Sequence, residues 1–406
     1  MTVTFLSYAA VQLQEGLFMP RIASTIAAVP SSGIRRIFEL AAGLDDVIPL
    51  AVGEPELPVA RHILRAGAEA WERDDTAYTP NSGIAPLRRA IAAKLDRYNG
   101  YRVSDEQVHV TSGGAQALHM AMSFTLEAGS EILIPDPGYP TFSMTPRLLG
   151  AVPVPYPLRS PHGFRPDLTE LESLVTPSTR ALLINSPSNP LGVVFDRTTV
   201  AALLAFASRH DLWVISDEVY EYLTWTPGFV SAAAVDTENR VFGVYSLSKT
   251  YALTGARIGY LVTPAGLRER FAAAQESVVS CINAPAQYAA LAAVEGSQDD
   301  VRAAREHYRG NLAAACAVLD TKGLRYHRPA GAFYLWIDLS HATGGNVAAW
   351  AEDFLLSRRV AVAPGSAFGA AGEGWVRVCF AGQREPLLEA LSRLPSSGPQ
   401  GTGIGL

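Results

Sequence analysis

A regular alternation of short apolar runs and helix-like segments, from Val108 onward, restricts the fold more than any other feature of the sequence. Such an alternation is typical of parallel strands that are joined by crossover helices. The run Leu-Trp-Val-Ile-Ser at 212–216 is apolar at almost every position, as expected of a strand that is buried on both faces. The pattern therefore predicts an α/β fold built on a mainly parallel sheet.

Length and composition limit the kind of protein further. A chain of 406 residues is longer than one small core needs, so two domains are expected. The net charge of −6 gives no reason to expect nucleic acid or an anionic membrane as a partner. No apolar run has the length of a membrane span, and residues 1–30 lack the pattern of a signal peptide. Three scattered cysteines, Cys281, Cys316 and Cys379, fit a reducing compartment and no metal site, so we expect a cytoplasmic protein.

The domain boundaries are expected where composition and pattern change. Met19, followed by Pro20, leaves open whether the first residues are an arm or precede the true start of the chain. Gly296 lies near an expected change of domain, and the last residues are rich in Gly, Ser and Pro, which predicts disorder. The expected parts are an N-terminal arm at 1–30, a large domain at 52–296, a small domain formed by 31–51 and 297–394, and a disordered tail at 395–406.

The segment 245–260 carries the strongest indication of chemistry. Lys249 lies there in otherwise uncharged surroundings, three residues after Ser246 and eight before Arg257. A hydroxyl and a guanidinium close to an amine suit a phosphorylated carbonyl compound, because the amine can form a Schiff base while the other two groups hold phosphate. The structural alternative is a lysine whose stem packs and whose ammonium reaches solvent.

Two further positions suit a ligand at the ends of strands. A tight turn is expected at 112–116, before a helix at 117–126, and its glycines would leave free N–H groups that suit a phosphate. Asp217 directly follows the buried run at 212–216, where a carboxylate is costly unless it has a partner. A helix N-cap is the structural alternative for Asp217.

The segment 245–260 resembles the lysine motif of the class I/II aminotransferases, a branch of the fold-type I pyridoxal-phosphate enzymes. The resemblance covers about 31–394, and the motifs follow the family's order. These motifs are Gly-Glu-Pro at 53–55, Tyr-x-x-x-x-Gly at 78–83, the glycine turn at 112–116, Asn-Pro-Leu-Gly at 189–192, Asp-Glu-Val-Tyr at 217–220, and Pro-Gly-Ser-Ala-Phe at 364–368 with the arginine at 377. The resemblance implies a large domain with a mainly parallel seven-stranded sheet flanked by helices, and a smaller α/β domain.

The resemblance also implies pyridoxal 5′-phosphate as the cofactor. Lys249 would form the Schiff base and move a proton, with Asp217 keeping the ring nitrogen protonated. Asn189 and Tyr220 would bond the ring's phenolic oxygen, and Tyr220 counts with Lys249 and Asp217 as catalytic. Tyr139, on a stiff proline-rich loop after a strand at 131–134, would stack on the ring.

Phosphate and substrate ligands are implied in the same way. The phosphate ligands would be Gly114, Ala115, Ser246, Arg257 and, from the partner subunit, Tyr78. The substrate carboxylate would be held by Gly53, Asn189 and Arg377, whose planar fork suits two hydrogen bonds to a carboxylate. Without the resemblance, Arg377 reads as an exposed strand arginine, and Tyr78 as a loop aromatic that packs on its own domain. The implied assembly is a homodimer with composite active sites.

The implied activity is transfer of an amino group between an L-amino acid and a 2-oxo acid. The uncharged segment 281–285, expected at the neighbouring subunit's pocket, slightly favours neutral or aromatic amino acids. Other reactions on the same scaffold stay open: β-elimination (as in C–S lyases), decarboxylation, cyclisation and oxidation. A non-catalytic sensor that binds the cofactor is a further alternative, although no basic arm or DNA-binding segment precedes residue 31.

Overall fold

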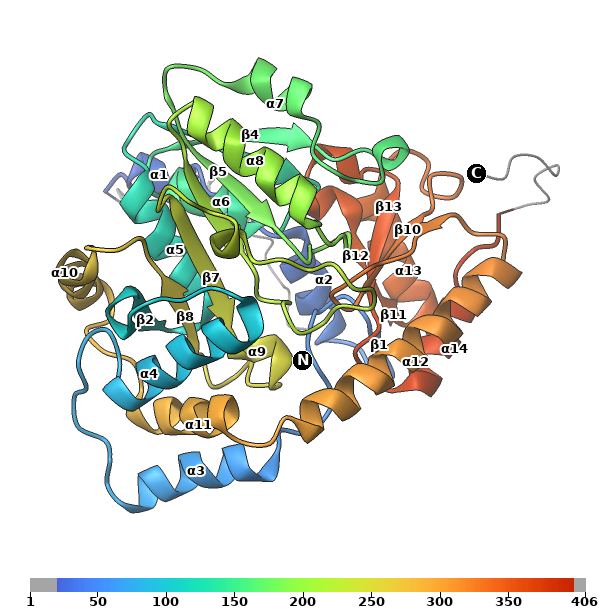
Figure 1. The fold of residues 1–406 in the computed structure, drawn as a ribbon. Helices are drawn as coiled ribbons and strands as arrows, with labels where there is room; N and C mark the ends of the chain where they lie inside the picture. Colours follow the sequence, from blue (N-terminus) through green and yellow to red (C-terminus); the bar gives the residue numbers. More distant parts are fainter. Residues whose placement is uncertain (1–19, 398–406) are drawn as a thin grey trace.

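The computed structural model describes residues 20–397, and Figure 1 shows a twisted sheet flanked by helices beside a second, smaller sheet. Residues 1–19 of the expected arm and 398–406 of the expected tail lie outside the described residues. In the rest of the arm, helix α1 (Ser24–Ala27) contacts helix α6 (Thr141–Leu148). Between residues 20 and 397, no helix combines the length and the hydropathy that crossing a membrane requires.

The larger sheet has seven strands, and all neighbouring strands are parallel except the two pairs that include β8. The apolar run at 212–216 forms most of β6, which occupies the central position as predicted. In spatial order the strands are β2 (Val108–Thr111), β8 (Gly259–Val262), β7 (Val241–Ser246), β6 (Trp213–Asp217), β5 (Thr179–Asn185), β3 (Glu131–Asp136) and β4 (Val152–Pro157).

Helices cover both faces of this sheet, which explains why its strands are apolar at successive positions. Leu183 of β5 packs in one apolar cluster with Leu118, whereas the neighbouring Leu182 packs in another with Leu203. Successive side chains of a strand point to opposite faces, so both faces are buried. The helices of this part are α3 (Arg61–Glu72), α4 (Ala85–Lys94), α5 (Gly113–Thr125), α6, α7 (Leu168–Leu174), α8 (Arg197–Arg209), α9 (Leu247–Thr250), α10 (Arg268–Val278) and α11 (Ala284–Glu295).

The smaller region combines the two ends of the described chain. Strand β1 (Ile48–Pro49) pairs in parallel with β11 (Val360–Ala361), and helix α2 (Gly33–Ala41) contacts α13 (Val347–Arg358). The boundaries of two domains stay a prediction, which this pairing supports. The other elements are α12 (Asp299–Thr321), α14 (Arg384–Ser392) and an antiparallel sheet in the order β12 (Ala363–Pro364), β13 (Trp375–Cys379), β10 (Tyr334–Asp338) and β9 (Tyr326–His327).

One element begins earlier than the sequence predicts. Helix α5 starts at Gly113, so the residues expected to form a turn at 112–116 are its first turn. The Gln116 side chain accepts a hydrogen bond of 2.6 Å from the backbone N–H of Ser112, which stabilises this start. The first turn of α5 therefore lies directly after β2 and, through Gly114, next to Ser246 at the end of β7.

Candidate active site

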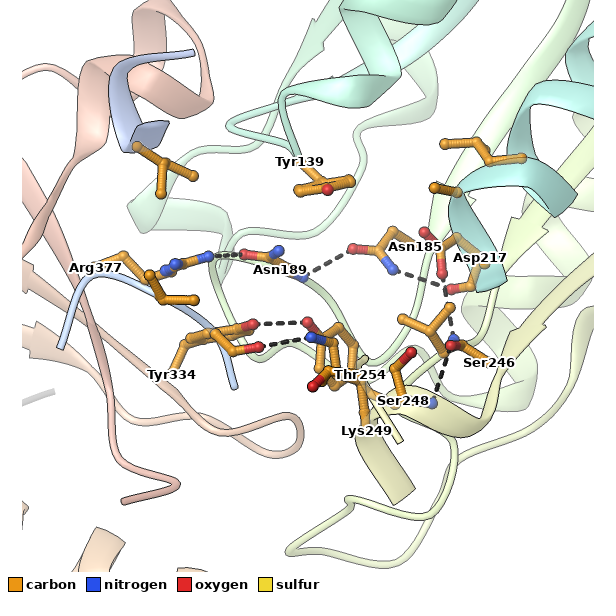
Figure 2. Close-up of a pocket in the computed structure, with 18 of the residues that line it drawn as sticks. Tyr139, Asn185, Asn189, Asp217, Ser246, Ser248, Lys249, Thr254, Tyr334 and Arg377 are labelled. Atoms are coloured by element: carbon orange, nitrogen blue, oxygen red, sulfur yellow. Dashed lines mark hydrogen bonds between the residues drawn. The ribbon is translucent and has the colours of Figure 1, made fainter. Parts of the chain in front are cut away.

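A cavity of about 300 Å³ lies at the carboxyl-terminal ends of β5, β6 and β7, where parallel sheets commonly bind ligands (Figure 2). Asn185, Asp217 and Ser246 are the last residues of these three strands, and all three line the cavity. The opposite wall comes from Arg377 and Tyr334 of the smaller sheet. The structure brings together eleven of the twelve predicted site residues here: Gly53, Gly114, Ala115, Tyr139, Asn189, Asp217, Tyr220, Ser246, Lys249, Arg257 and Arg377.

One end of the cavity is suited to an anion. A Cβ atom at Gly113 would lie 2.6 Å from Nη2 of Arg257, and one at Gly114 would lie 3.3 Å from Cβ of Ser246. The two glycines therefore let a guanidinium and a hydroxyl approach the N-terminus of α5. Backbone N–H groups, the positive end of a helix and a guanidinium together make a site for a phosphate or similar anion.

Asp217 is a buried acid without a cationic partner among the described residues. Its side chain accepts a 3.2 Å hydrogen bond from the backbone N–H of Val219, and the residue is only 6% exposed. Burial raises the pKa of Asp217 to about 7. Asn185 fixes the end of the strand, since its amide donates to the Asp217 carbonyl at 3.0 Å. A cation placed in the cavity beside Asp217 would keep the carboxylate ionised.

Lys249 lies in the short helix α9, directly after β7. Its ammonium donates a 2.6 Å hydrogen bond to the backbone carbonyl of Gly53, which also lines the cavity. Burial lowers the pKa of Lys249 to about 8, and the positive charge of Arg377 acts in the same direction. The side chain is thus an amine that loses its proton close to neutral pH, as a nucleophile requires.

Arg377 occupies the other end of the cavity, and the structure buries it to 2% exposure. Its Nη1 donates to Oδ1 of Asn189 at 2.9 Å, and Nη2 donates to the carbonyl of Ala51. Its buried Nε has no hydrogen-bond partner within the described residues, and the guanidinium lies against the rings of Tyr334 and Phe368. The reading of Arg377 as an exposed strand arginine is therefore wrong, and a planar cation is available to a carboxylate.

The three predicted tyrosines differ in position. Tyr139 lines the cavity, and Figure 2 shows its ring above Asn189 and Asn185. Tyr220 is buried, and burial raises its pKa well above the ordinary value. Tyr78 is 90% exposed and is the one predicted residue that does not line the cavity of its own chain.

Several lining residues were not predicted to have a role. Among the polar ones, Tyr334 and Asn185 are the most buried, and Ser248 and Thr254 lie near Lys249. The position of Asn185 carried a signal, because it is a polar residue at the end of a buried strand, as is Asp217. Tyr334 carried no such signal, since it lies inside a run that reads as an ordinary apolar strand.

Comparison with known proteins shows which family shares this sequence and fold. The profile of the family "Aminotransferase class I and II" matches residues 45–394. An aspartate aminotransferase of Pyrococcus abyssi is 38% identical, and an aromatic-amino-acid aminotransferase of Thermococcus litoralis is 36% identical. Each match covers 90% of this chain and 95% of the relative. The structure of an aspartate aminotransferase from Thermus thermophilus with maleate superposes with a TM-score of 0.88 at 33% identity, covering 92% of this chain and 99% of that one.

The extent of these matches leaves no large part of residues 45–394 outside the shared fold. The seven-stranded sheet, the lysine after β7 and the buried arginine of β13 all lie within the matched region. The chain therefore belongs to the class I and II aminotransferases, and it is a pyridoxal-phosphate-dependent transferase that acts on amino acids and 2-oxo acids.

Proposed function

We propose that Lys249, Asp217 and Arg377 are the central residues of amino transfer in this chain. The observation that carries the proposal is their arrangement in one cavity, where Lys249 lies between a buried acid and a buried guanidinium (Figure 2), neither of which forms an ion pair within the described residues. When bound, pyridoxal phosphate supplies an aldehyde that accepts the amino group and a ring that withdraws electrons from the substrate's Cα. The residues of the chain bind, orient and move protons around that chemistry.

The phosphate-binding residues of the proposal are Gly114, Ala115, Ser246 and Arg257. Their fit is supported by the absence of a Cβ at Gly113 and Gly114, which leaves room beside the N-terminus of α5. Arg257 donates through Nη1 to the carbonyl of Thr254 at 2.7 Å, which holds the guanidinium in place. A dianionic phosphate would receive charge-assisted hydrogen bonds from both the arginine and the helix.

Asp217 would hold the proton of the ring nitrogen. The fit is supported by its burial with no cationic partner between residues 20 and 397, because a protonated ring nitrogen would supply that positive charge. Asn189 and Tyr220 would donate to the ring oxygen, and Tyr139 would cover the ring face. These contacts would orient the ring without requiring movement of the buried strand ends.

Lys249 would bind the cofactor covalently and then move a proton at its Nζ. A pKa of about 8 suits both tasks, since the amine can gain and lose a proton near neutral pH. Arg377 and Asn189 would hold the substrate carboxylate, with the Gly53 backbone beside it. The Nε of Arg377, which has no acceptor in the described part of the chain, supports this role, because a buried donor without an acceptor is costly until a ligand arrives.

The preferred amino donor is proposed to be neutral or aromatic. The cavity-lining side chains include three cations, Lys249, Arg257 and Arg377, and the proposal assigns each to cofactor or to the α-carboxylate. None of the described lining residues remains to pair with a second substrate carboxylate, whereas Ile34 and Val52 add apolar surface. Relative rates with L-phenylalanine, L-alanine and L-aspartate test the preference, and a clear advantage for aspartate would contradict it.

We also propose a homodimer in which Tyr78 reaches the partner's phosphate site. Trp71 is 59% exposed and lines a shallow groove that also includes Cys281 and Arg257, so an apolar face runs up to the edge of the cavity. Tyr78→Phe and Lys249→Ala proteins, each poorly active, should regain activity on mixing if subunits exchange and sites are shared.

A cytoplasmic location is also proposed, which the free thiols of the three cysteines support.

The decisive experiment separates amino transfer from the other reactions of this cofactor. The purified protein with an amino acid alone should release one equivalent of 2-oxo acid per site and then stop. Addition of a different 2-oxo acid should restart release and yield its amino acid. Continuous release of ammonia or carbon dioxide with the amino acid alone would support elimination or decarboxylation.

A further inference from the structure

Tyr334 lines the active-site cavity, yet none of the roles above uses it. It is the first residue of β10, and it is 1% exposed. Its hydroxyl lies 2.7 Å from the hydroxyl of Tyr220. A buried hydroxyl needs a hydrogen-bond partner, so the hydroxyl of Tyr334 contributes a polar contact to the cavity in addition to its packing.

Tyr334 also touches the groups proposed to hold the substrate. Its ring centre lies 4.3 Å from Cζ of Arg377, so the guanidinium stacks on the ring. A Cβ at Gly53 would lie 1.9 Å from the Tyr334 hydroxyl, so residue 53 must lack a side chain while Tyr334 is present. The same Gly53 carbonyl accepts the hydrogen bond of Lys249.

The pairing of β10 with β13 explains this position. Tyr334 pairs with Cys379, and Trp336 pairs with Arg377, in an antiparallel register. Tyr334 and Arg377 are therefore diagonal neighbours on adjacent strands, within reach of an aromatic ring and a long side chain. The contact follows from the register of the sheet and not from a flexible loop.

Either hydroxyl of the Tyr220–Tyr334 pair can be the donor of their hydrogen bond, and the choice decides where the Tyr220 proton points. Burial raises the pKa of both Tyr220 and Tyr334, so both are neutral and each has one proton to donate. Within the described residues, neither hydroxyl forms a hydrogen bond other than the one that joins them. Tyr220 can donate into the cavity only if its oxygen accepts from Tyr334, and a chain of two such bonds strengthens both.

We propose that Tyr334 is a positioning residue of the amino-transfer site. It donates to the Tyr220 oxygen, which turns the Tyr220 proton toward the ring oxygen of the cofactor, and its ring supports the guanidinium of Arg377. The inference rests on the proposed roles of Tyr220 and Arg377. It links the cofactor side of the cavity to the substrate side through one buried side chain.

The test uses Tyr334→Phe in the cofactor-loaded protein, with Tyr156→Phe as the matched control. Tyr156 is also 1% exposed, and its hydroxyl donates to the Leu183 carbonyl at 2.9 Å outside the cavity. The readout is the pH midpoint of the visible absorbance change of the bound cofactor, which a purely structural role would not move. A donated hydrogen bond stabilises negative charge on the ring oxygen, so weakening it should raise the midpoint.

We expect Tyr334→Phe to raise the midpoint by about half a unit to one unit, the size of one neutral hydrogen bond, and Tyr156→Phe to leave it unchanged. In a Tyr220→Phe background, Tyr334→Phe should add no further shift, because its effect passes through Tyr220. Tyr334→Leu should additionally raise KM for the amino acid severalfold, since Arg377 loses its ring support.

Three outcomes would overturn the proposal. The first is an unchanged midpoint in Tyr334→Phe, and the second is an equal shift with or without the Tyr220 hydroxyl. The third is an unchanged midpoint in Tyr220→Phe itself. Borohydride fixation of the cofactor at Lys249 is measured in each variant, so failure of the Tyr334 proposal is distinguishable from failure of the lysine assignment.

Discussion

Two lysines inside this protein have opposite surroundings. Lys94, at the end of α4, is 4% exposed, and its ammonium pairs with the buried Glu221 and bonds Oδ1 of Asn99 at 2.9 Å. Lys249 forms no ion pair within residues 20–397 and bonds a backbone carbonyl instead. Burial lowers the pKa of both amines, but at Lys94 the carboxylate of Glu221 opposes the shift.

Aromatic rings around Lys94 add to the compensation of its positive charge by Glu221. The rings of four tyrosines lie within 6.0 Å of its ammonium, and one of their hydroxyls accepts from it at 3.2 Å. The tyrosines are Tyr98, Tyr222, Tyr245 and Tyr260. A cation with its own carboxylate and its own hydrogen bonds has nothing left to offer a ligand.

The comparison indicates how a binding cation differs from a structural one. Lys249 and Arg377 both lack a carboxylate partner among the described residues, and both line the cavity. Arg325, in contrast, pairs with Asp338 beside the same small sheet. The chain thus leaves positive charge unmatched in the place where an anionic substrate and cofactor are expected to supply the match.

The largest effect is expected from removing the unmatched lysine. Lys249→Ala should lower amino-transfer activity by at least about 10²–10⁴-fold, because a positioned acid–base group is worth that much. The chain has three lysines, so the assignment can be checked directly. Borohydride reduction of the wild-type protein followed by peptide mapping should find the cofactor on Lys249, and label on Lys94 or Lys322 would contradict the comparison.

Removing Lys94, which is paired with Glu221, should lower the stability of the fold without affecting cofactor binding at Lys249. Lys94→Met leaves Glu221 buried without its partner, so the free energy of unfolding should fall by about 3–5 kcal/mol. Denaturation in urea measures this change, and Lys249 of the folded fraction should still take up the cofactor. The double variant Lys94→Met with Glu221→Leu should regain most of the stability, because no unpaired charge remains. A double variant as unstable as the single one would show that the pair itself is needed.

Much of this fold could be predicted because its signals are local in sequence. The run at 212–216 predicted the central strand. Asp217 is the last residue of β6, Lys249 lies three residues beyond the last residue of β7, and both side chains line the cavity. The early start of α5 could not be predicted, because Gly113 and Gly114 are poor helix formers and the hydrogen bond of Gln116 to Ser112 is visible only in the structure.

Other features depended on contacts between distant segments. Strand β3 continues through Pro135 to Asp136, beyond the predicted end at residue 134. Pro135 is tolerated because its part of β3 pairs with β4 alone, beyond the last residue that pairs with β5. The place of Tyr334 depends on the register of β10 against β13, and the sequence of neither strand states that register.

The same comparison can be tested with two arginines, Arg377, which has no carboxylate partner among the described residues, and Arg325, which is paired with Asp338. Arg377→Ala should raise KM for the amino acid by roughly ten- to a hundredfold, since a charge-assisted bidentate contact contributes about 1.5–3 kcal/mol. The maximal rate should change less, because the carboxylate is bound before and during the reaction. Arg325→Ala, which removes a paired and exposed guanidinium, should leave KM unchanged. Equal effects of the two substitutions would argue against a special role for the unmatched cation.

The smallest expected effect is the change in the neutral fraction of the Lys249 amine between pH 8 and pH 10. If the pKa of Lys249 is about 8, half of its amine is already neutral at pH 8, and raising the pH to 10 can increase the neutral fraction only about twofold. An ordinary lysine, with a pKa near 10.4, would gain roughly seventyfold over the same interval. Only the neutral amine attacks an aldehyde, so the rate at which cofactor-free protein takes up pyridoxal phosphate reports this fraction. Dividing each rate by that of a free lysine derivative at the same pH removes the ionisation of the cofactor itself. The ratio should therefore fall steeply between pH 8 and 10, since the protein amine is nearly saturated while the free amine still gains. A constant ratio would mean that Lys249 titrates like an ordinary surface lysine. The absence of a carboxylate partner would then not distinguish the reactivity of Lys249 from that of Lys94, which is paired with Glu221.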